Sequence, residues 1–597
     1  MKKTAPFVLR ALAVCLCALM LLPLFAACKN DGTGDGTSDA VTTAPEAVSF
    51  PALWEGSTVN YRTVRPDEGT AAEQEAAMEI SSALRKYSGG NPEIGTDFVM
   101  PGEEHSSESF EILVGQTSYP ESRQVAAETG YGGAGPAEGG GYAVRTVGHK
   151  IVVFGWNDTS LATAVRRFTD LLEGGAEFAQ PIAITGSVSE TLDAIPTFEG
   201  ANKVIIYSVG DKAYENVIEK SSAEAFASYC ARLAEAGFEM TFDRTENSNN
   251  FAQYKKGDVG VTVYFTAFNN TVRIISEPAS NMSDRSADTA TVEKKCDARL
   301  TMIGRTFSKT GSYRGVPVNC GLMCFVLRLE NGSFIVIDGG VATEGFAAGI
   351  MDTMKSQAPD PSHIHIAAWI ITHTHSDHTG GFNKFSETYG RRVTLDELIL
   401  NFPSEDTCDA SPDHELNNRK KTLNNFKVYY PKAKLTKIHT GETRNIGGAG
   451  VEFLYTPEDY YTSKRTFADT KLWNNTSLIF RVTIAGQKLM FLGDSQVDSN
   501  GIAVKMWGGY LKSDICQVAH HGGEGGTAAV YNAIDPTVAL FTTSDEAFEL
   551  YKKDAHNAHL LRKLHVKEVI NCACRITEFP LPYTPGNSAV TDKGNVY

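Results

Sequence analysis

Short apolar runs alternate with helical repeats of apolar residues along the chain from about residue 50 onward. Residues 111–115 and 150–155 are apolar runs that end in glycine, a pattern typical of buried strands. Residues 71–87 and 159–172 instead repeat apolar side chains at helical spacing. This order predicts an accessory α/β domain over residues 50–190.

A second unit with a different pattern follows over residues 196–280. Its apolar runs predict a strand at 203–207 and a hairpin formed by 259–265 and 271–275. Helical spacing at 223–236 predicts one helix between them. The pattern therefore predicts a small α+β module.

The first of these units is similar to a known type of accessory domain. The sequences Glu111-Ile-Leu-Val-Gly115, Gly141-Tyr-Ala-Val-Arg145 and Lys150-Ile-Val-Val-Phe-Gly155, followed by a helix, carry the likeness. They resemble the non-catalytic N-terminal α/β domain of some glycoside hydrolases. The resemblance implies a supporting or carbohydrate-proximal role.

The N-terminus has the pattern of an export signal. Two lysines precede an apolar run over residues 7–27, and Cys28 follows it directly. Residues 25–28 resemble a bacterial lipobox, which implies cleavage after residue 27 and lipid on Cys28. We therefore expect a signal peptide at 1–27, a flexible tether at 28–49 and an extracytoplasmic protein anchored to the cell membrane. The alternative is an uncleaved transmembrane anchor.

Charge and histidine content differ between the two halves of the chain. The 55 Lys and Arg against 71 Asp and Glu give a net charge of 55 − 71 = −16. This balance argues against a protein that coats nucleic acid, and we expect no stable nucleic-acid complex. Twelve of the fourteen histidines follow residue 300, and histidine is the commonest metal ligand. We therefore expect the metal-binding or catalytic residues in the C-terminal half. The sequence leaves the oligomeric state open.

A dense cluster of metal-binding side chains follows one apolar strand. Residues 367–372 lead directly into His373, His375, Asp377 and His378. Four such groups in one loop would be costly to bury without a cation, so a merely solvated loop is the weaker interpretation. Imidazole and carboxylate ligands suit zinc, and manganese is the alternative.

The motif His-x-His-x-Asp-His after an apolar strand resembles the defining motif of the metallo-β-lactamase fold superfamily, with a likeness over residues 299–597. The resemblance implies an αββα sandwich at the C-terminus, preceded by the two smaller α/β (α+β) units. It also implies two divalent metal ions, and a bond from Asp338 to the metal-binding loop.

The same resemblance implies roles for single residues. It assigns six metal ligands: His373 and His375 for the first metal, Asp377 and His378 for the second, Asp494 between both, and one of His520 and His521 for the second, with His521 favoured. Two adjacent metals would generate hydroxide at neutral pH. Asp377 would orient this hydroxide, and His520 would contact the substrate or protonate the leaving group.

Two further features are similar to one branch of this superfamily. The sequence Asn475-Thr-Ser477-Leu resembles a strand of that branch. The histidine that completes the first metal site in many members has no clear counterpart, because neither His414 nor His439 follows a clear strand next to Gly or Thr. We therefore expect a first metal that is weakly held or replaced by water.

The branch contains DNA-uptake competence proteins and the phosphorylcholine esterase of teichoic acids. It implies an anionic or cell-wall-derived phosphodiester substrate, such as a cell-wall polymer, a choline phosphate ester or nucleic acid. One alternative is hydrolysis of a β-lactam, lactone or thioester at the same centre. The other is a non-enzymatic cell-surface lipoprotein that binds carbohydrate.

Overall fold

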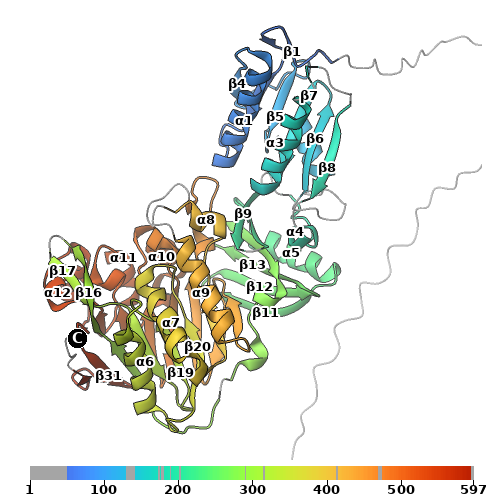
Figure 1. Cartoon of the computed structure of the whole chain (residues 1–597). Helices are drawn as coiled ribbons and strands as arrows, with labels where there is room; N and C mark the ends of the chain where they lie inside the picture. Colours follow the sequence, from blue (N-terminus) through green and yellow to red (C-terminus); the bar gives the residue numbers. More distant parts are fainter. Residues whose placement is uncertain are drawn as a thin grey trace, which may run out of the picture. The chain divides into compact units, whose positions relative to one another are not determined.

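The computed structural model describes residues 50–592 apart from positions 130–140, 157, 173–174, 177–180, 188–189, 201–203, 211, 290, 314–315, 412–414 and 468–472 (Figure 1). The expected signal peptide, the tether, Cys28 and His414 lie outside these residues. Among the helices in the described part, none is both long and apolar enough to cross a membrane.

Residues 62–187 form a six-stranded sheet with the order β4-β3-β5-β7-β6-β8. The strands are β3 (Arg62–Arg65), β4 (Ile94–Thr96), β5 (Glu111–Val114), β6 (Gly141–Val147), β7 (Lys150–Gly155) and β8 (Ala183–Ser187). The helices α1 (Ala71–Ser88) and α3 (Asp158–Leu172) pack on one face, and α2 (Pro120–Glu128) packs on the other. The predicted strands and helices of this region are present within a few residues of their expected positions.

A second, antiparallel sheet has the order β11-β12-β13-β14-β10-β9. Its strands are β9 (Ile205–Gly210), β10 (Ala213–Ile218), β11 (Glu239–Glu246), β12 (Asn249–Lys256), β13 (Val259–Thr266) and β14 (Thr271–Pro278). The helix α5 (Ala223–Glu235) starts after Ser222, whose hydroxyl accepts a hydrogen bond from the Ala225 amide. The predicted hairpin is β13–β14, and the predicted helix is α5.

The C-terminal half is built on two larger sheets. The first has the order β23-β22-β20-β19-β18-β15-β31-β32, with β21 also paired to β20, and the second has the order β24-β25-β26-β27-β28-β29-β30. The strands of the first sheet are β15 (Arg299–Ile303), β18 (Cys324–Arg328), β19 (Phe334–Asp338), β20 (Ile364–Ile370), β21 (Val393–Leu395), β22 (Glu397–Leu400), β23 (Lys434–Lys437), β31 (Ile576–Pro580) and β32 (Ala589–Asp592). Those of the second are β24 (Thr443–Ile446), β25 (Ala449–Tyr455), β26 (Ile479–Ile484), β27 (Gln487–Phe491), β28 (Ile515–Gln517), β29 (Val538–Phe541) and β30 (Glu568–Asn571).

One apolar core joins the facing sides of these two sheets. Alternate residues of both sheets, such as Ile337 and Phe480, are buried in it, and the rings of Phe325 and Phe491 meet edge to face at 5.4 Å. Strand side chains point to the two faces in turn, so each sheet also has an apolar outer face that needs a cover.

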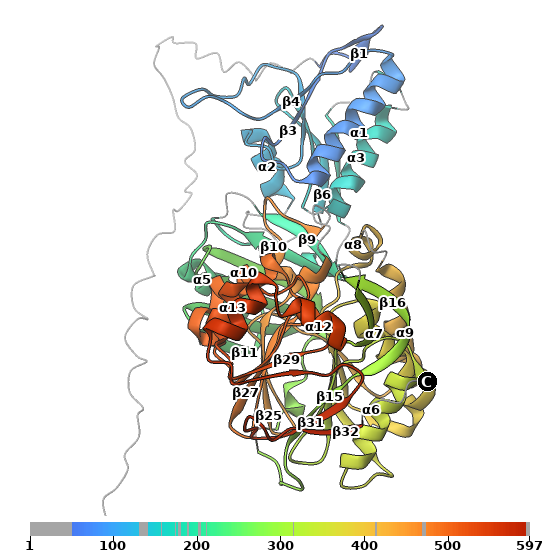
Figure 2. The same cartoon turned by 90° about the vertical axis from the view of Figure 1, so that its left-hand side faces the viewer.

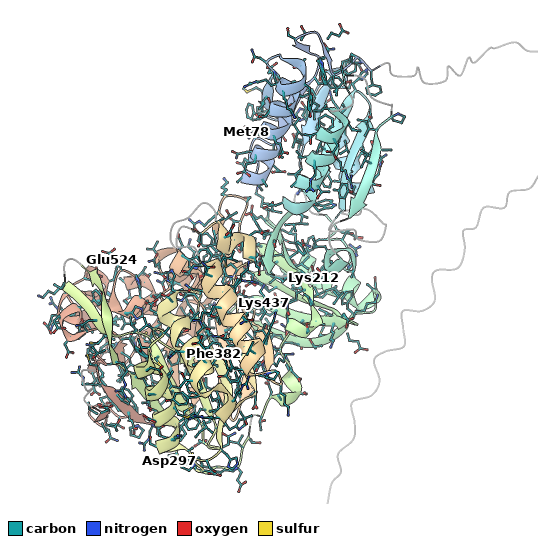
Figure 3. The ribbon with its side chains drawn as sticks, viewed as in Figure 1. Met78, Lys212, Asp297, Phe382, Lys437 and Glu524 are labelled. Atoms are coloured by element: carbon teal, nitrogen blue, oxygen red, sulfur yellow. The ribbon has the colours of Figure 1, made fainter. Side chains whose placement is uncertain are left out.

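Helices cover both outer faces, as Figures 1 and 2 show. The first sheet is covered by α6 (Glu344–Gln357), α7 (Ser376–Tyr389) and α9 (Leu416–Tyr429). Phe382, labelled on α7 in Figure 3, packs on Trp369 of β20. The second is covered by α10 (Val497–Trp507), α11 (Ala528–Ile534) and α13 (Ala555–Lys563). The mixed α/β class is confirmed, whereas the expected domain boundaries stay predictions.

The antiparallel sheet β9–β14 also packs against this outer layer. Phe251 of β12 stacks on Trp507 of α10 at 5.6 Å, within one buried cluster that contains residues of both parts. Arg273 of β14 is buried and donates hydrogen bonds to Glu215 at 2.8 Å and to three backbone carbonyls of residues 458–461. Buried ion pairs and apolar contacts therefore hold the small sheet in place.

His439 belongs to the same buried junction. It does follow a strand, β23, and precedes Thr440, so the sequence argument against it was wrong in its premise. Its Nε2 lies 2.7 Å from Glu277 and its Nδ1 lies 3.3 Å from Glu458, which also pairs with Lys437. Both ring nitrogens face carboxylates, and His439 is not among the residues of the ligand groups described below.

The burial of His439 between carboxylates predicts a pH-dependent stability. Burial opposes its charged form, but Glu277 and Glu458 outweigh burial and raise the pKa of His439 to about 10. The folded pKa lies above the unfolded pKa of about 6.5. The stabilisation is therefore complete below pH 6.5 and is lost as the pH rises through 10. Urea unfolding at several pH values should show a steeper loss of stability over this interval in the wild type than in His439→Gln. Equal slopes would contradict this assignment.

Candidate metal centre

The candidate metal ligands lie in loops that follow strands of both large sheets. β20 leads into the loop of His373, and α7 begins directly after it with Asp377 and His378 in its first turn. β27 leads to Asp494, and β28 leads to His521. Strands from both sheets therefore deliver ligands to one place.

His373 and His375 form a first group with Asp494. The Nε2 of His373 lies 3.0 Å from the Nδ1 of His375. One ligand atom from each of the three residues lies within 4.8 Å of the others. His373 is buried and His375 is half-buried. Two imidazole nitrogens that face one point beside a carboxylate suit a divalent cation.

Asp377, His378 and His521 form a second group, again with Asp494. The Nε2 atoms of His378 and His521 lie 3.2 and 3.3 Å from Asp494 Oδ2, and Asp377 Oδ2 lies 3.3 Å from His521 Nε2. Asp494 is the residue that the two groups share, which is the position expected of a bridging ligand. The structure thus brings together all six predicted metal ligands.

Several ligand atoms in the second group lack a hydrogen-bond partner among the described residues. These buried atoms are Nε2 of His378, Nε2 of His521 and Oδ1 of Asp494. Unsatisfied buried polar atoms are costly and uncommon, and a bound metal ion would satisfy all three. The residues present therefore fit a metal centre.

Asp338 fixes the orientation of one ligand from outside the group. It is the last residue of β19, has a left-handed backbone (φ 51°) and accepts hydrogen bonds from the amide and hydroxyl of Thr372, both at 2.8 Å. Its Oδ2 lies 2.7 Å from Nδ1 of His378. A proton on Nδ1 leaves Nε2 of His378 as the ligand atom. Asp338 therefore bonds to the metal-binding loop, as the resemblance implied.

Replacement of Asp338 by asparagine should weaken metal binding about 10–100-fold, the usual effect of losing such a partner. The asparagine side chain can still accept a hydrogen bond from the Thr372 amide, so the fold should be retained. Competition with a chromogenic chelator measures the affinity, and Asp352→Asn on the exposed side of α6 is the matched control. Unchanged affinity in Asp338→Asn would contradict the proposed role.

Two hydroxyl groups contact other ligands, and the sequence had not indicated these contacts. Ser477 Oγ lies 3.2 Å from Nδ1 of His373 and accepts a hydrogen bond from the Asp494 amide at 3.1 Å. Thr542 Oγ1 lies 3.0 Å from Nδ1 of His521. Both residues follow or precede strands of the second sheet, so only its strand order brings them to the site. Ser477 was noticed in the sequence only within the motif Asn475-Thr-Ser477-Leu, and a threonine at a strand end carries no signal of its own.

The adjacent residues His520 and His521 have different places in the structure. Both have left-handed backbone conformations, with φ of 52° and 57°. His521 belongs to the second ligand group, whereas Nε2 of His520 lies 3.8 Å from Asp494 Oδ2 and 3.4 Å from Asn474 Nδ2. The geometry thus favours His521 as the ligand and leaves His520, whose side chain is 32% exposed, beside the centre.

The ligand groups differ in how firmly their histidines hold a proton. Burial holds the pKa of His373 well below its usual range. Burial acts in the same direction on His378, but Asp494 and Asp338 outweigh it and raise the pKa well above its usual value. Burial also opposes the charged form of His521, but Asp494 outweighs it and raises the pKa to about 9. A metal ion at the second group would therefore displace protons from these histidines.

Comparison with known proteins agrees with the ligand geometry. Residues 313–409, which include the loop from His373 to His378, match the family model of the metallo-beta-lactamase superfamily. The chain therefore contains a domain of this superfamily, whose members are mostly metal-dependent hydrolases with a dinuclear centre. No curated protein matches the sequence.

Two kinds of solved structure show a distant likeness. One is CmlA, a diiron beta-hydroxylase from Streptomyces venezuelae, with 11% identity and a TM-score of 0.26 over 50% of this chain and 54% of that chain. The other is a point mutant of a flavo di-iron protein from Thermotoga maritima, with 13% identity and a TM-score of 0.18 over 62% of this chain and 57% of that chain. The chain thus spans little more than half the length of either protein, and TM-scores this low carry no functional argument.

Proposed function

We propose that this metallo-beta-lactamase superfamily domain is a dinuclear metal-dependent hydrolase that cleaves phosphodiesters. The observation that carries the proposal is the pair of ligand groups that share Asp494. A carboxylate common to both groups would place two cations side by side, which is the arrangement that two-metal phosphoryl hydrolysis requires. The finding that the chain contains a domain of this superfamily supports the hydrolase class.

The donor atoms indicate which cations would fit. His373 and His375 with Asp494 would hold one ion, and Asp377, His378 and His521 with Asp494 would hold the other. When bound, two such ions lower the pKa of a shared water and stabilise negative charge on the reacting group. Nitrogen and oxygen donors without sulfur suit zinc or manganese, so we propose zinc, with manganese as the alternative.

Two side chains would act on the substrate and the attacking water. Burial opposes ionisation of Asp377, but the neighbouring imidazoles of His521 and His378 outweigh it and hold the pKa below its usual range. The ionised Asp377 carboxylate can therefore accept a hydrogen bond from the water. Burial lowers the pKa of His520. A neutral His520 favours hydrogen bonding to a phosphoryl oxygen over protonation of the leaving group at neutral pH.

The choice of a phosphodiester rests on charge and on the first ligand group. Residues 301–597 carry 30 basic and 31 acidic residues, a net charge of 30 − 31 = −1, so an anionic substrate meets little repulsion there. The first group contains two histidines, because Glu277 and Glu458 hold His439 elsewhere. A first site with two histidines is the feature by which the sequence resembles the branch with phosphodiester substrates. If the N-terminus is exported and lipidated at Cys28 as its sequence predicts, the substrate would be a cell-wall polymer or a choline phosphate ester.

Assays on the full chain test this proposal. We expect the metal-loaded protein to hydrolyse bis-p-nitrophenyl phosphate, to lose this activity with a chelator and to regain it with zinc or manganese. Elemental analysis should find two metal ions per chain. Turnover of nitrocefin without phosphodiester cleavage would favour a β-lactam or related acyl substrate instead. Absence of both activities in a chain that binds two ions would favour the non-enzymatic interpretation.

A further inference from the structure

Glu415 lies beside the metal-binding loop, although it follows His375 by 40 residues in the sequence. It is the residue just before α9, and His375 is the residue just before α7. These helices lie side by side (Figures 1 and 2), and the Asn383 side chain of α7 donates to Thr422 of α9 at 3.2 Å. Glu415 Oε1 lies 3.8 Å from His375 Nε2. The paired helix starts therefore bring this carboxylate to the imidazole ring.

The Glu415 carboxylate is buried without a strong cationic partner. Its side chain is 4% exposed, and it does not cap its own helix. Oε2 accepts a hydrogen bond from Asn418 at 3.0 Å. Among the residues that the structure describes, no lysine or arginine forms an ion pair with it, and His375 is the partner. A buried carboxylate is costly without compensating positive charge, so its position favours a cation at or beyond His375.

The two nitrogens of His375 face different neighbours. Nδ1 lies 3.0 Å from His373 Nε2, inside the first ligand group. Nε2 points to Glu415. A metal ion held by Nδ1 would leave the proton on Nε2 and would make that N–H a stronger donor toward the Glu415 carboxylate. Metal-ligating histidines commonly donate their second N–H to such a carboxylate.

We propose that Glu415 is the positioning residue of the first metal: it accepts the Nε2 hydrogen of His375, fixes Nδ1 as the ligand atom and strengthens that ligand. The inference rests on the proposed dinuclear centre and deepens it. It offers a reason why a site with two histidines can hold its ion, because a carboxylate behind one histidine raises the basicity of that ligand.

Cobalt(II) titration of the metal-free full chain tests this role through the ligand-field absorption of each site. Relative to the wild type, we expect the first site to bind cobalt about tenfold more weakly in Glu415→Gln and up to about 100-fold more weakly in Glu415→Ala. Glutamine can still accept the N–H but carries no charge. The second site should keep its affinity. Glu405→Gln is the matched control, because Glu405 is half exposed and pairs with Arg419 away from His375.

A double-mutant cycle separates positioning from a merely structural effect. In a His375→Ala background, Glu415→Ala should cause no further loss of cobalt affinity, because its effect acts through the ring. An equal loss with and without His375, or unchanged first-site affinity in both Glu415 variants, would overturn the proposal. If Glu415→Ala does not fold, the near-isosteric Glu415→Gln carries the same comparison. A wild type that binds fewer than two cobalt ions would instead count against the dinuclear centre itself.

Discussion

Replacement of Asp494 by asparagine is expected to reduce kcat/KM for phosphodiester hydrolysis by at least about a thousandfold. Two bound cations supply several kcal/mol of transition-state stabilisation, and each 1.4 kcal/mol changes the rate about tenfold. Asp494 belongs to both ligand groups, so its loss should affect both ions. It also lies within 3.3 Å of His378 and His521, whose positive charge its own negative charge favours.

Steady-state kinetics and elemental analysis of Asp494→Asn check this expectation. Fewer than two tightly bound metal ions per chain should accompany the loss of activity. The control is Asp498→Asn, four residues further on, because Asp498 pairs with the partly exposed Arg465 outside the ligand groups. Asp494→Asn with both ions at wild-type affinity would rule out a bridging role. Wild-type activity in this variant would exclude the centre as the site of hydrolysis.

Replacement of Arg273 by methionine is expected to lower the free energy of unfolding by about 3–5 kcal/mol, the usual cost of removing one partner of a buried ion pair. The Arg273 side chain is 1% exposed, and it donates hydrogen bonds to Glu215 and to three backbone carbonyls of residues 458–461. Methionine fills much of the same volume but leaves these acceptors unsatisfied. Burial opposes the charged form of Glu215 and raises its pKa, so once Arg273 is removed the carboxyl can relieve part of the loss by binding a proton.

Urea unfolding at neutral pH measures this effect. Arg575→Met is the control, since Arg575 pairs with Asp545 on the surface at 33% and 59% side-chain exposure, where an ion pair contributes less than about 1 kcal/mol. Adding Glu215→Gln to Arg273→Met should restore part of the stability, because no buried charge is then left alone. Equal losses in Arg273→Met and Arg575→Met would show that the junction does not depend on its arginine.

The metal ligands that share one loop could be predicted from the sequence, because residues so close in the chain must also lie close together in the fold. His373, His375, Asp377 and His378 sit within six residues at a strand end. Asp494 was accessible through the apolar strand before it and the family resemblance. The choice between His520 and His521 was not, because it depends on left-handed backbone angles at both residues.

Groups that reach the site from other elements left no comparable pattern. Thr542 and Glu415 are ordinary polar residues in the sequence, and Ser477 was noticed only within the motif Asn475-Thr-Ser477-Leu. Their contacts with the ligands arise only from strand order and from the pairing of α7 with α9. The packing of residues 205–278 on the metal-binding half was missed for a similar reason. One signal was present: Arg273 interrupts the apolar run 271–275. A charged residue there needs a buried partner, and Glu215 together with residues 458–461 supplies it.

The packing of the small sheet also limits how the gene can be cut for expression. A product that begins at residue 299 would retain the whole ligand set but lose the strands that cover Trp507 and Tyr461, whose rings pack on Phe251 and Tyr207. Such a fragment would expose these aromatic rings to solvent, and we expect it to aggregate into inclusion bodies on expression. A start before residue 204 keeps that cover and is the sensible boundary for crystallisation or screening.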